Sequence, residues 1–126
     1  MQKLLCAAFS AAVITLSVSA PAVFAHHSFA VFDFQTQLPF EGTVESVKFR
    51  NPHIAVTLKV KAADGTEKLV EFIEGAPANM LVRQGLRPEQ MAVGSHISAL
   101  GSPLIEDPTK FFLRLIKLDD GTEFRN

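Results

Sequence analysis

An alternating segment in the middle of the chain predicts an antiparallel β structure. From Ile54 to Lys61, large apolar side chains alternate with small or polar ones. A period of two gives a strand one buried face and one wet face. Asp64-Gly65 follows, and glycine supplies the positive φ that a tight hairpin turn needs. The chain is therefore expected to return as a second strand over about Glu67 to Ile73.

The flanking segments predict three more strands and a short helix. Phe40 to Phe49 alternates as a long first strand that bends near Gly42, and Pro52 interrupts it because proline lacks the N–H that a strand ladder needs. Pro77 fits the first turn of a helix that Gly85 can end in a left-handed cap. The last two strands are expected over Ser95 to Leu100 and over Lys110 to Leu118.

This order of elements predicts the fold class. Three strands, one short helix and two further strands, with a long bent first strand, fit an all-β, five-stranded, OB-like Greek-key barrel. Other small β barrels and an open β sandwich fit the same order. The chain has no internal repeat that would favour another architecture.

The first 25 residues have the pattern of an export signal. Lys3 gives a positive start, an apolar run extends from Leu4 to about Ser19, and Val23-Phe24-Ala25 offers the small or aliphatic residues that signal peptidase prefers. A retained membrane anchor is the alternative, since the run approaches the ~20 apolar residues that span a bilayer. We expect a cleaved signal peptide over residues 1–25 and a domain over residues 26–126, in the periplasm or secreted.

Cleavage would leave a small domain of nearly balanced charge. Removing 25 of the 126 residues leaves 101, enough for one core and one domain. Lys3 is one of 12 basic residues, so 11 remain against 13 acidic ones, a formal charge of −2. This balance argues against a nucleic-acid binder, which needs cations to neutralise phosphates. The only cysteine, Cys6, lies in the leader, so residues 26–126 offer neither a disulfide nor a thiolate ligand.

Cleavage after Ala25 would also make His26 the amino terminus. Its α-amine and Nδ1 can chelate a metal ion, and an imidazole from elsewhere in the fold would complete the three-nitrogen arrangement called a histidine brace, which suits Cu(II). Their protons are loosely held, with reference pKa values of about 6.5 for histidine and about 7.7–8.0 for the amine. His27 offers a second, purely local mode, through the terminal amine, its own amide nitrogen and its imidazole. Alternatively, both histidines are ordinary polar residues at a chain end.

Other residues could complete such a site. His53 is the predicted third nitrogen ligand, because Pro52 fixes the turn before it and places it at a stiff strand end. His96 would join only if the barrel brings two strand ends together. Asp33 and Glu74 could orient a liganding imidazole without touching the metal. The ordinary alternatives are a histidine bonded to the backbone or exposed, and a carboxylate that is solvated or caps a turn.

A terminus must be tethered to hold a metal well. Phe29, Val31 and Phe34 are the apolar side chains that could tie the new terminus to the core.

Several short motifs are spread over nearly all of the chain after residue 25. They include His26-His27-Ser28-Phe29, Asn51-Pro52-His53 and Ile73-Glu74-Gly75. Together they resemble a family of short secreted bacterial proteins of unknown function, and the HHSF start and the NPH tripeptide are the most specific pieces. The resemblance implies export and the domain boundary, but it implies no chemistry.

The combined prediction is a periplasmic, non-enzymatic binding protein that holds copper through His26, with help from His53. The carboxylates have no spacing that forces a pair together and no nucleophile motif is present, so catalysis has no support. A copper-dependent oxidase acting on a polymer would need a larger substrate surface. The alternative from another class is a metal-free OB-like module that binds an unknown cell-envelope partner or a small ligand. Neither function needs a membrane after signal cleavage.

Overall fold

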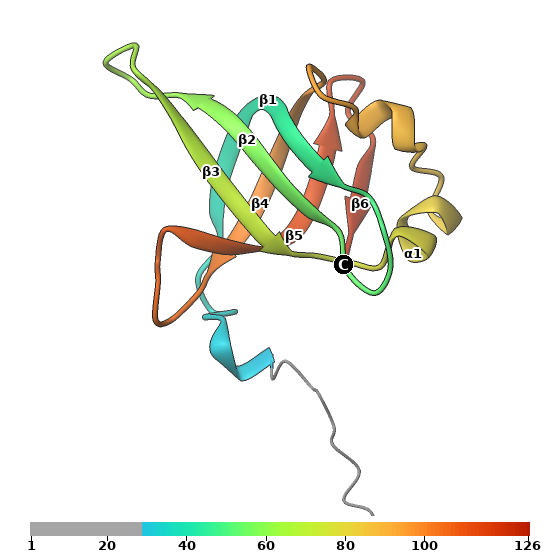
Figure 1. Cartoon of the computed structure of the whole chain (residues 1–126), viewed down its shortest axis with the longest axis horizontal. Helices are drawn as coiled ribbons and strands as arrows, with labels where there is room; N and C mark the ends of the chain where they lie inside the picture. The colour runs from blue at the N-terminus through green and yellow to red at the C-terminus, as the bar shows by residue number, and fades with distance from the viewer. Residues whose placement is uncertain (1–28) are drawn as a thin grey trace, which may run out of the picture.

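The computed structural model describes residues 29–126, which form an all-β structure with one short α-helix (Figure 1). None of the helices in this part of the chain is long and apolar enough to cross a membrane. The elements are, in chain order, the 3-10 helix η1 (Phe29–Val31), β1 (Leu38–Lys48), β2 (Ala55–Lys61), β3 (Glu67–Glu74), α1 (Ala78–Arg83), the 3-10 helix η2 (Pro88–Met91), β4 (His96–Pro103), β5 (Lys110–Leu118) and β6 (Glu123–Arg125).

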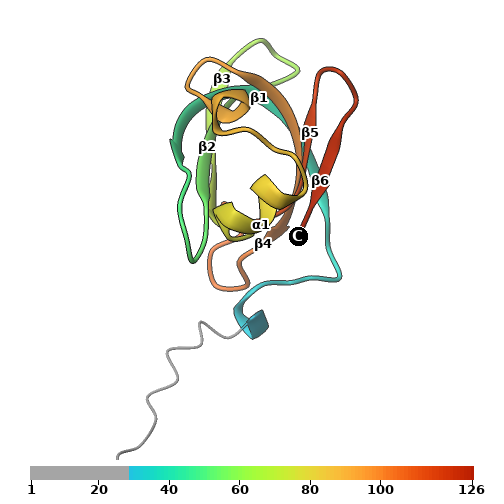
Figure 2. The ribbon, with the colours of Figure 1, turned by 90° about the vertical axis from the view of Figure 1, so that its right-hand side faces the viewer.

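Five strands close into a barrel. β1 pairs antiparallel with β2 and with β4, β2 pairs with β3, and β4 pairs with β5. The parallel pairing of β3 with β5 closes the ring, so the order around the barrel is β1-β2-β3-β5-β4. Figure 2 shows the strands enclosing the interior, with α1 at one end. The predicted five-stranded OB-like barrel with one short helix is confirmed.

The first strand belongs to both halves of the barrel because it is long and bent. Its first part, Leu38 to Thr43, pairs with β4, and its second part, Thr43 to Lys48, pairs with β2. The register shifts between Val44 and Ser46, where a bulge increases the bend. Gly42 lies at this change of partner, and a Cβ there would be 2.3 Å from the carbonyl oxygen of Lys59. The absence of a side chain therefore lets the two strands meet.

The alternating residues of the central hairpin form the middle of the core. Val56 and Leu58 of β2, together with Val70 and Phe72 of β3, are buried. Phe40, Phe72 and Phe111 pack ring against ring, with centroids 4.7–5.9 Å apart. Aromatic pairs at such separations add to the free energy of area burial. Residues 29–126 contain no cysteine and can form no disulfide, so packing of this kind stabilises the barrel.

β6 was not predicted from the sequence, in which Asp120-Gly121 was expected only to turn the tail. This strand of three residues pairs with Leu115 to Lys117 of β5. Its other edge meets the side chain of Gln84, whose Nε2 donates to the Arg125 carbonyl at 2.8 Å and whose Oε1 accepts from the Arg125 N–H at 3.1 Å. One amide side chain thus satisfies the backbone of this edge as a neighbouring strand would.

Replacing Gln84 with Ala should loosen β6. Two hydrogen bonds are lost, and because the site is partly wet we expect the free energy of unfolding to fall by about 1–2 kcal/mol. Urea denaturation measures the fall, and faster hydrogen exchange of the Arg125 amide would locate it. Gln35→Ala is the matched control, with an expected change within about 0.5 kcal/mol. Equal stability of the two variants would mean that Gln84 does not hold β6.

Candidate functional site

The first described residues are fastened to one end of the barrel by backbone hydrogen bonds. The Asp33 N–H donates to the Pro103 carbonyl at 2.9 Å, and the Ile105 N–H donates to the Val31 carbonyl at 2.8 Å. Phe32 lies opposite Leu104 in an isolated antiparallel bridge. The segment Phe29–Phe34, called the anchor below, thus extends the sheet beyond the end of β4. In Figure 1 it lies against the lower end of the barrel.

Aromatic packing strengthens this attachment. The Phe32 side chain is only 5% exposed, and its ring centroid lies 5.3 Å from that of Phe112. Phe34 packs edge-on against the same Phe112 ring at 5.3 Å, and the Arg114 guanidinium lies 4.9 Å from the Phe34 centroid. The sequence had suggested Phe29, Val31 and Phe34 for this task. Phe34 contributes, Val31 is exposed and acts through its carbonyl, and Phe32 is the buried residue.

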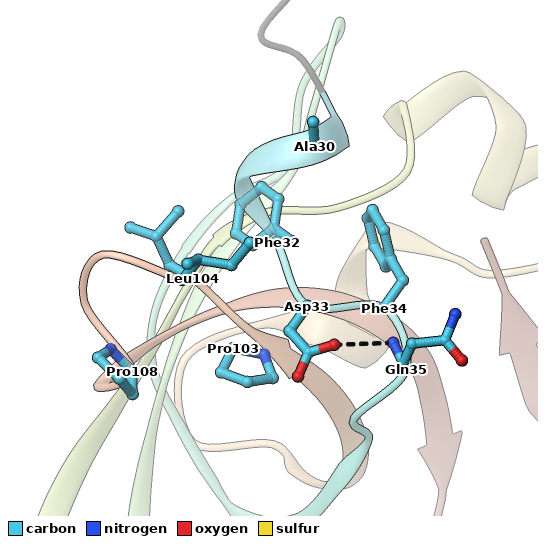
Figure 3. A pocket seen from close by; sticks show the side chains of 9 residues that line it. Ala30, Phe32, Asp33, Phe34, Gln35, Pro103, Leu104 and Pro108 are labelled. Carbon is cyan, nitrogen blue, oxygen red and sulfur yellow. Dashed lines mark hydrogen bonds between the residues drawn. The ribbon is translucent and has the colours of Figure 1, made fainter.

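A pocket of about 680 Å³ lies between the anchor and the loop that joins β4 to β5 (Figure 3). It is mainly apolar, and Asp33 is the charged residue in its lining. The Asp33 carboxylate accepts hydrogen bonds from the Gln35 N–H at 3.0 Å and from the Thr36 hydroxyl at 2.7 Å. The pocket is lined by Ala30, Phe32, Asp33, Phe34, Gln35, Pro103, Leu104, Ile105 and Pro108. Asp33 therefore holds the turn at the end of the anchor, and among residues 29–126 its side-chain hydrogen bonds are to Gln35 and Thr36.

These bonds predict how the anchor responds to pH. The hydrogen bond from the Thr36 hydroxyl, the largest cause, lowers the pKa of Asp33 below 3.8. A carboxylate with a lowered pKa contributes stability above its unfolded pKa and loses it as pH falls through the folded value. The turn should therefore loosen only below about pH 3.8, and Thr36→Val should raise the pKa of Asp33. NMR titration of the Asp33 carboxyl carbon checks this, and an unchanged midpoint in the variant would contradict it.

His53 lies between β1 and β2, at the end of the barrel where β3 finishes. Its Nδ1 is 3.0 Å from the Gly75 carbonyl oxygen, and because a carbonyl can only accept, Nδ1 carries the proton. In a neutral imidazole this leaves the lone pair on Nε2. The side chain is 38% exposed, so solvent can reach the ring. His53 thus makes the backbone hydrogen bond expected of a histidine that is not a metal ligand. The same bond leaves Nε2 available to bind a metal ion.

Glu74 lies beside that available nitrogen. Its Oε1 is 3.5 Å from His53 Nε2, and its side chain is only 15% exposed. Glu74 pairs with Phe112 between β3 and β5, and Phe112 is the ring against which the anchor packs. The barrel therefore brings His53 and Glu74 together, at the end that carries the anchor. Glu74 faces the nitrogen that would bind a metal, whereas the sequence had suggested that it orients the imidazole from outside.

His96 lies at the other end of the barrel, at the start of β4. Its Nδ1 is 2.7 Å from Asp119 Oδ1, and its Nε2 is 3.4 Å from Glu41 Oε1. Asp119 directly follows β5, seven residues beyond Phe112, which corresponds to roughly 23 Å of extended strand. His96 and His53 are thus not brought together. The two carboxylates face opposite nitrogens of the His96 ring, so one ion cannot bind all three groups.

His26 and His27 lie outside the described residues, so the predicted terminal chelate remains a prediction. Within residues 29–126, no group of three or more histidine, cysteine, aspartate or glutamate side chains is placed to hold a metal ion. A complete site at His53 would thus need ligands from outside that range.

Sequence reasoning missed three features of this end of the barrel. The Gly75 carbonyl that orients His53 is a backbone group, so the residue types in the sequence do not reveal this contact. Phe112 and Arg114 were assigned only to a strongly apolar strand, although they hold the anchor. The apolar pattern of β5 offered a signal, because Phe111 and Phe112 are consecutive and cannot both face the core.

Comparison with known proteins identifies a family but no activity. No curated protein and no solved structure matches the chain. Residues 12–110 match a family of unknown function, DUF6152. The match covers most of the sequence, so the chain belongs to the DUF6152 family of unknown function.

Proposed function

We propose that this protein is an exported, non-enzymatic binding protein that holds Cu(II) at its mature amino terminus. The signal over residues 1–25 would be removed in the periplasm or during secretion, leaving His26 with a free amine. The amine and Nδ1 of His26 would form a chelate, and Nε2 of His53 would supply the third nitrogen. Planar nitrogen ligands favour Cu(II) over other divalent ions. The bound copper could be stored, buffered or passed to another protein.

The anchor is the observation that carries this proposal. A free chain end binds a metal poorly because ordering it costs conformational entropy, about 1–2 kcal/mol per residue for the backbone alone. Here Phe32 and Phe34 pack on Phe112, and the backbone is hydrogen-bonded to Pro103 and Ile105, so this cost is already met from Val31 onward, five residues after His26. Five residues reach about 17 Å when extended. An anchor at the end of the barrel that carries His53 supports a site shared by His26 and His53.

The surroundings of His53 also suit a ligand. Metal-binding histidines commonly donate their second ring N–H to a carbonyl or carboxylate, which fixes the tautomer and the ring orientation. The bond from His53 Nδ1 to the Gly75 carbonyl is of this type. The Glu74 carboxylate, 3.5 Å from Nε2, places a negative charge where a cation would sit. His96 has comparable contacts, with Asp119 and Glu41, but it lies at the other end of the barrel. We therefore assign it no role with copper.

Two variants test which terminal histidine holds the metal. In a histidine brace the imidazole of residue 26 binds, so His26→Ala should lower the Cu(II) affinity of the processed protein by at least about 100-fold. His27→Ala should change the affinity by less than about threefold. Competition titration with a copper-binding dye measures both. The reverse order would favour the local chelate through His27, and no loss in either variant would refute a terminal copper site.

The second candidate is a metal-free module that binds a small ligand or an envelope partner. A pocket on the outer face of the barrel, to which the anchor contributes no residue, favours the small ligand. Blocking the terminus with one extra residue before His26 should leave such a function unchanged.

A further inference from the structure

The outer face of β1, β4, β5 and β6 carries a second pocket, of about 460 Å³. These four strands are neighbours in the sheet, and Figure 1 shows β4, β5 and β6 side by side. Ligand sites in proteins typically have volumes of about 300–1,000 Å³. The pocket is thus large enough for a small molecule, and neither the anchor nor His53 contributes to its lining.

The strand registers place a row of polar side chains across this pocket. Glu41 lies opposite Ser98, Ser98 opposite Lys117, and Lys117 opposite Glu123. Directly opposite residues project from the same face of a sheet, with backbones about 4.8 Å apart. An acid, a hydroxyl and a base therefore stand in a line over three adjacent strands. Glu41 and Lys117 are two strand spacings apart, about 9.6 Å between their backbones.

An apolar row lies directly beside the polar one. Pro39 is opposite Leu100, Leu100 is opposite Leu115, and Leu115 is opposite Arg125. Leu115 is two residues before Lys117, so both project to the outer face. It is nevertheless only 6% exposed, although it is not part of the core cluster. The pocket thus has a floor of leucine side chains next to a charged rim.

The charged side chains of the rim differ in how closely they are ion-paired. Arg125 is paired with Glu123 at 2.7 Å, so these two side chains neutralise one another. Glu41 has a loose contact of 3.4 Å with His96. Within residues 29–126, Lys117 takes part in no ion pair, although it lies opposite Glu123 of β6. The pocket therefore offers one free ammonium group and one weakly engaged carboxylate, with apolar surface beside both.

From this complementarity we infer that the pocket binds a small zwitterion with apolar side chains, of about the size of a dipeptide. Lys117 binds its carboxylate, Glu41 binds its ammonium group, and Leu100 and Leu115 cover its side chains. The spacing of Glu41 and Lys117 favours a dipeptide over a single amino acid, because the two charges of an amino acid are too close together to meet both. This site does not depend on copper.

Matched probes test the three recognition elements separately. NMR titration of the copper-free protein with one extra residue before His26 should show leucyl-leucine shifting the amides of β4 and β5 around Ser98, Leu100 and Lys117. Acetylated leucyl-leucine lacks the ammonium group, leucyl-leucine amide lacks the carboxylate, and glycyl-glycine lacks the apolar side chains. Each should bind at least about tenfold more weakly than leucyl-leucine. Because the terminus is blocked, failure here would leave the copper proposal untouched.

Two variants test which side chain binds each charged end of the dipeptide. Lys117→Ala should remove the preference for the free carboxylate, and Glu41→Gln the preference for the free ammonium group, each with an affinity loss of about tenfold or more. Lys68→Ala, an exposed lysine on β3, is the control and should bind as the unaltered protein does. Absence of binding at about 10 mM leucyl-leucine, or equal affinity in Lys117→Ala, would overturn the inference. Shifts confined to another face of the barrel would overturn it too.

Discussion

Replacing Gly42 with Ala is expected to lower the free energy of unfolding by more than about 4 kcal/mol, enough to unfold a domain of this size. The new Cβ would lie 2.3 Å from the carbonyl oxygen of Lys59 and 3.0 Å from its carbonyl carbon. Both are backbone atoms of the paired strand, so no side-chain rotation relieves the clash. The strands would have to separate where β1 changes partner, and the barrel would open.

Gly65 provides the matched control for this prediction. It has a φ of +85° in the hairpin turn, and a Cβ there would meet no atom within 4 Å. Gly65→Ala therefore introduces only the cost of a left-handed backbone, about 1–2 kcal/mol. Urea denaturation followed by circular dichroism compares the two variants. A Gly42→Ala protein as stable as Gly65→Ala would mean that β1 and β2 do not meet as described.

Replacing His53 with Ala is expected to weaken Cu(II) binding by at least about 100-fold, because the proposed site loses its only ligand from the barrel. The fold should be little affected. The side chain is partly exposed and makes one hydrogen bond to Gly75, whose loss costs about 1 kcal/mol. The loss of copper affinity is therefore separable from a loss of stability by measuring denaturation on the same samples.

His96→Ala is the control for His53→Ala. It removes another partly exposed histidine in contact with carboxylates, at the other end of the barrel. Its copper affinity should stay within about threefold of that of the unaltered protein. If His53→Ala binds copper equally well, the barrel takes no part and the terminal residues bind the metal alone.

The fold was predictable from the sequence where a pattern extends over many residues. Two strands were predicted correctly from the alternation of Ile54 to Lys61 and from the apolar segment of Lys110 to Leu118. The Asp64-Gly65 turn predicted the strand that follows it. β6 escaped prediction because three residues are too few to show a period. Its edge is completed by Gln84, 41 residues earlier in the sequence, and no local signal indicates that contact.

The candidate site was only partly predictable for the same reason. Residue types identified His53 and Glu74, but only the fold reveals that they adjoin and that the anchor lies at the same end. In the sequence only the preceding Pro52 favoured His53 over His96, since both stand at the start of an alternating segment. The register separates the two, because it places them near opposite ends of β5. Asp33 resembled a metal-site carboxylate, yet its local bonds to Gln35 and Thr36 suffice to explain it.

The most direct test is Cu(II) titration of the processed protein that starts at His26, followed by electron paramagnetic resonance, beside a protein with one extra amino-terminal residue. The extra residue converts the α-amine of His26 into an amide and leaves every side chain unchanged. The proposed function predicts tight binding with a nitrogen-rich axial spectrum in the processed protein and its loss in the extended one. Weak binding that is the same in both proteins would contradict a terminal copper site.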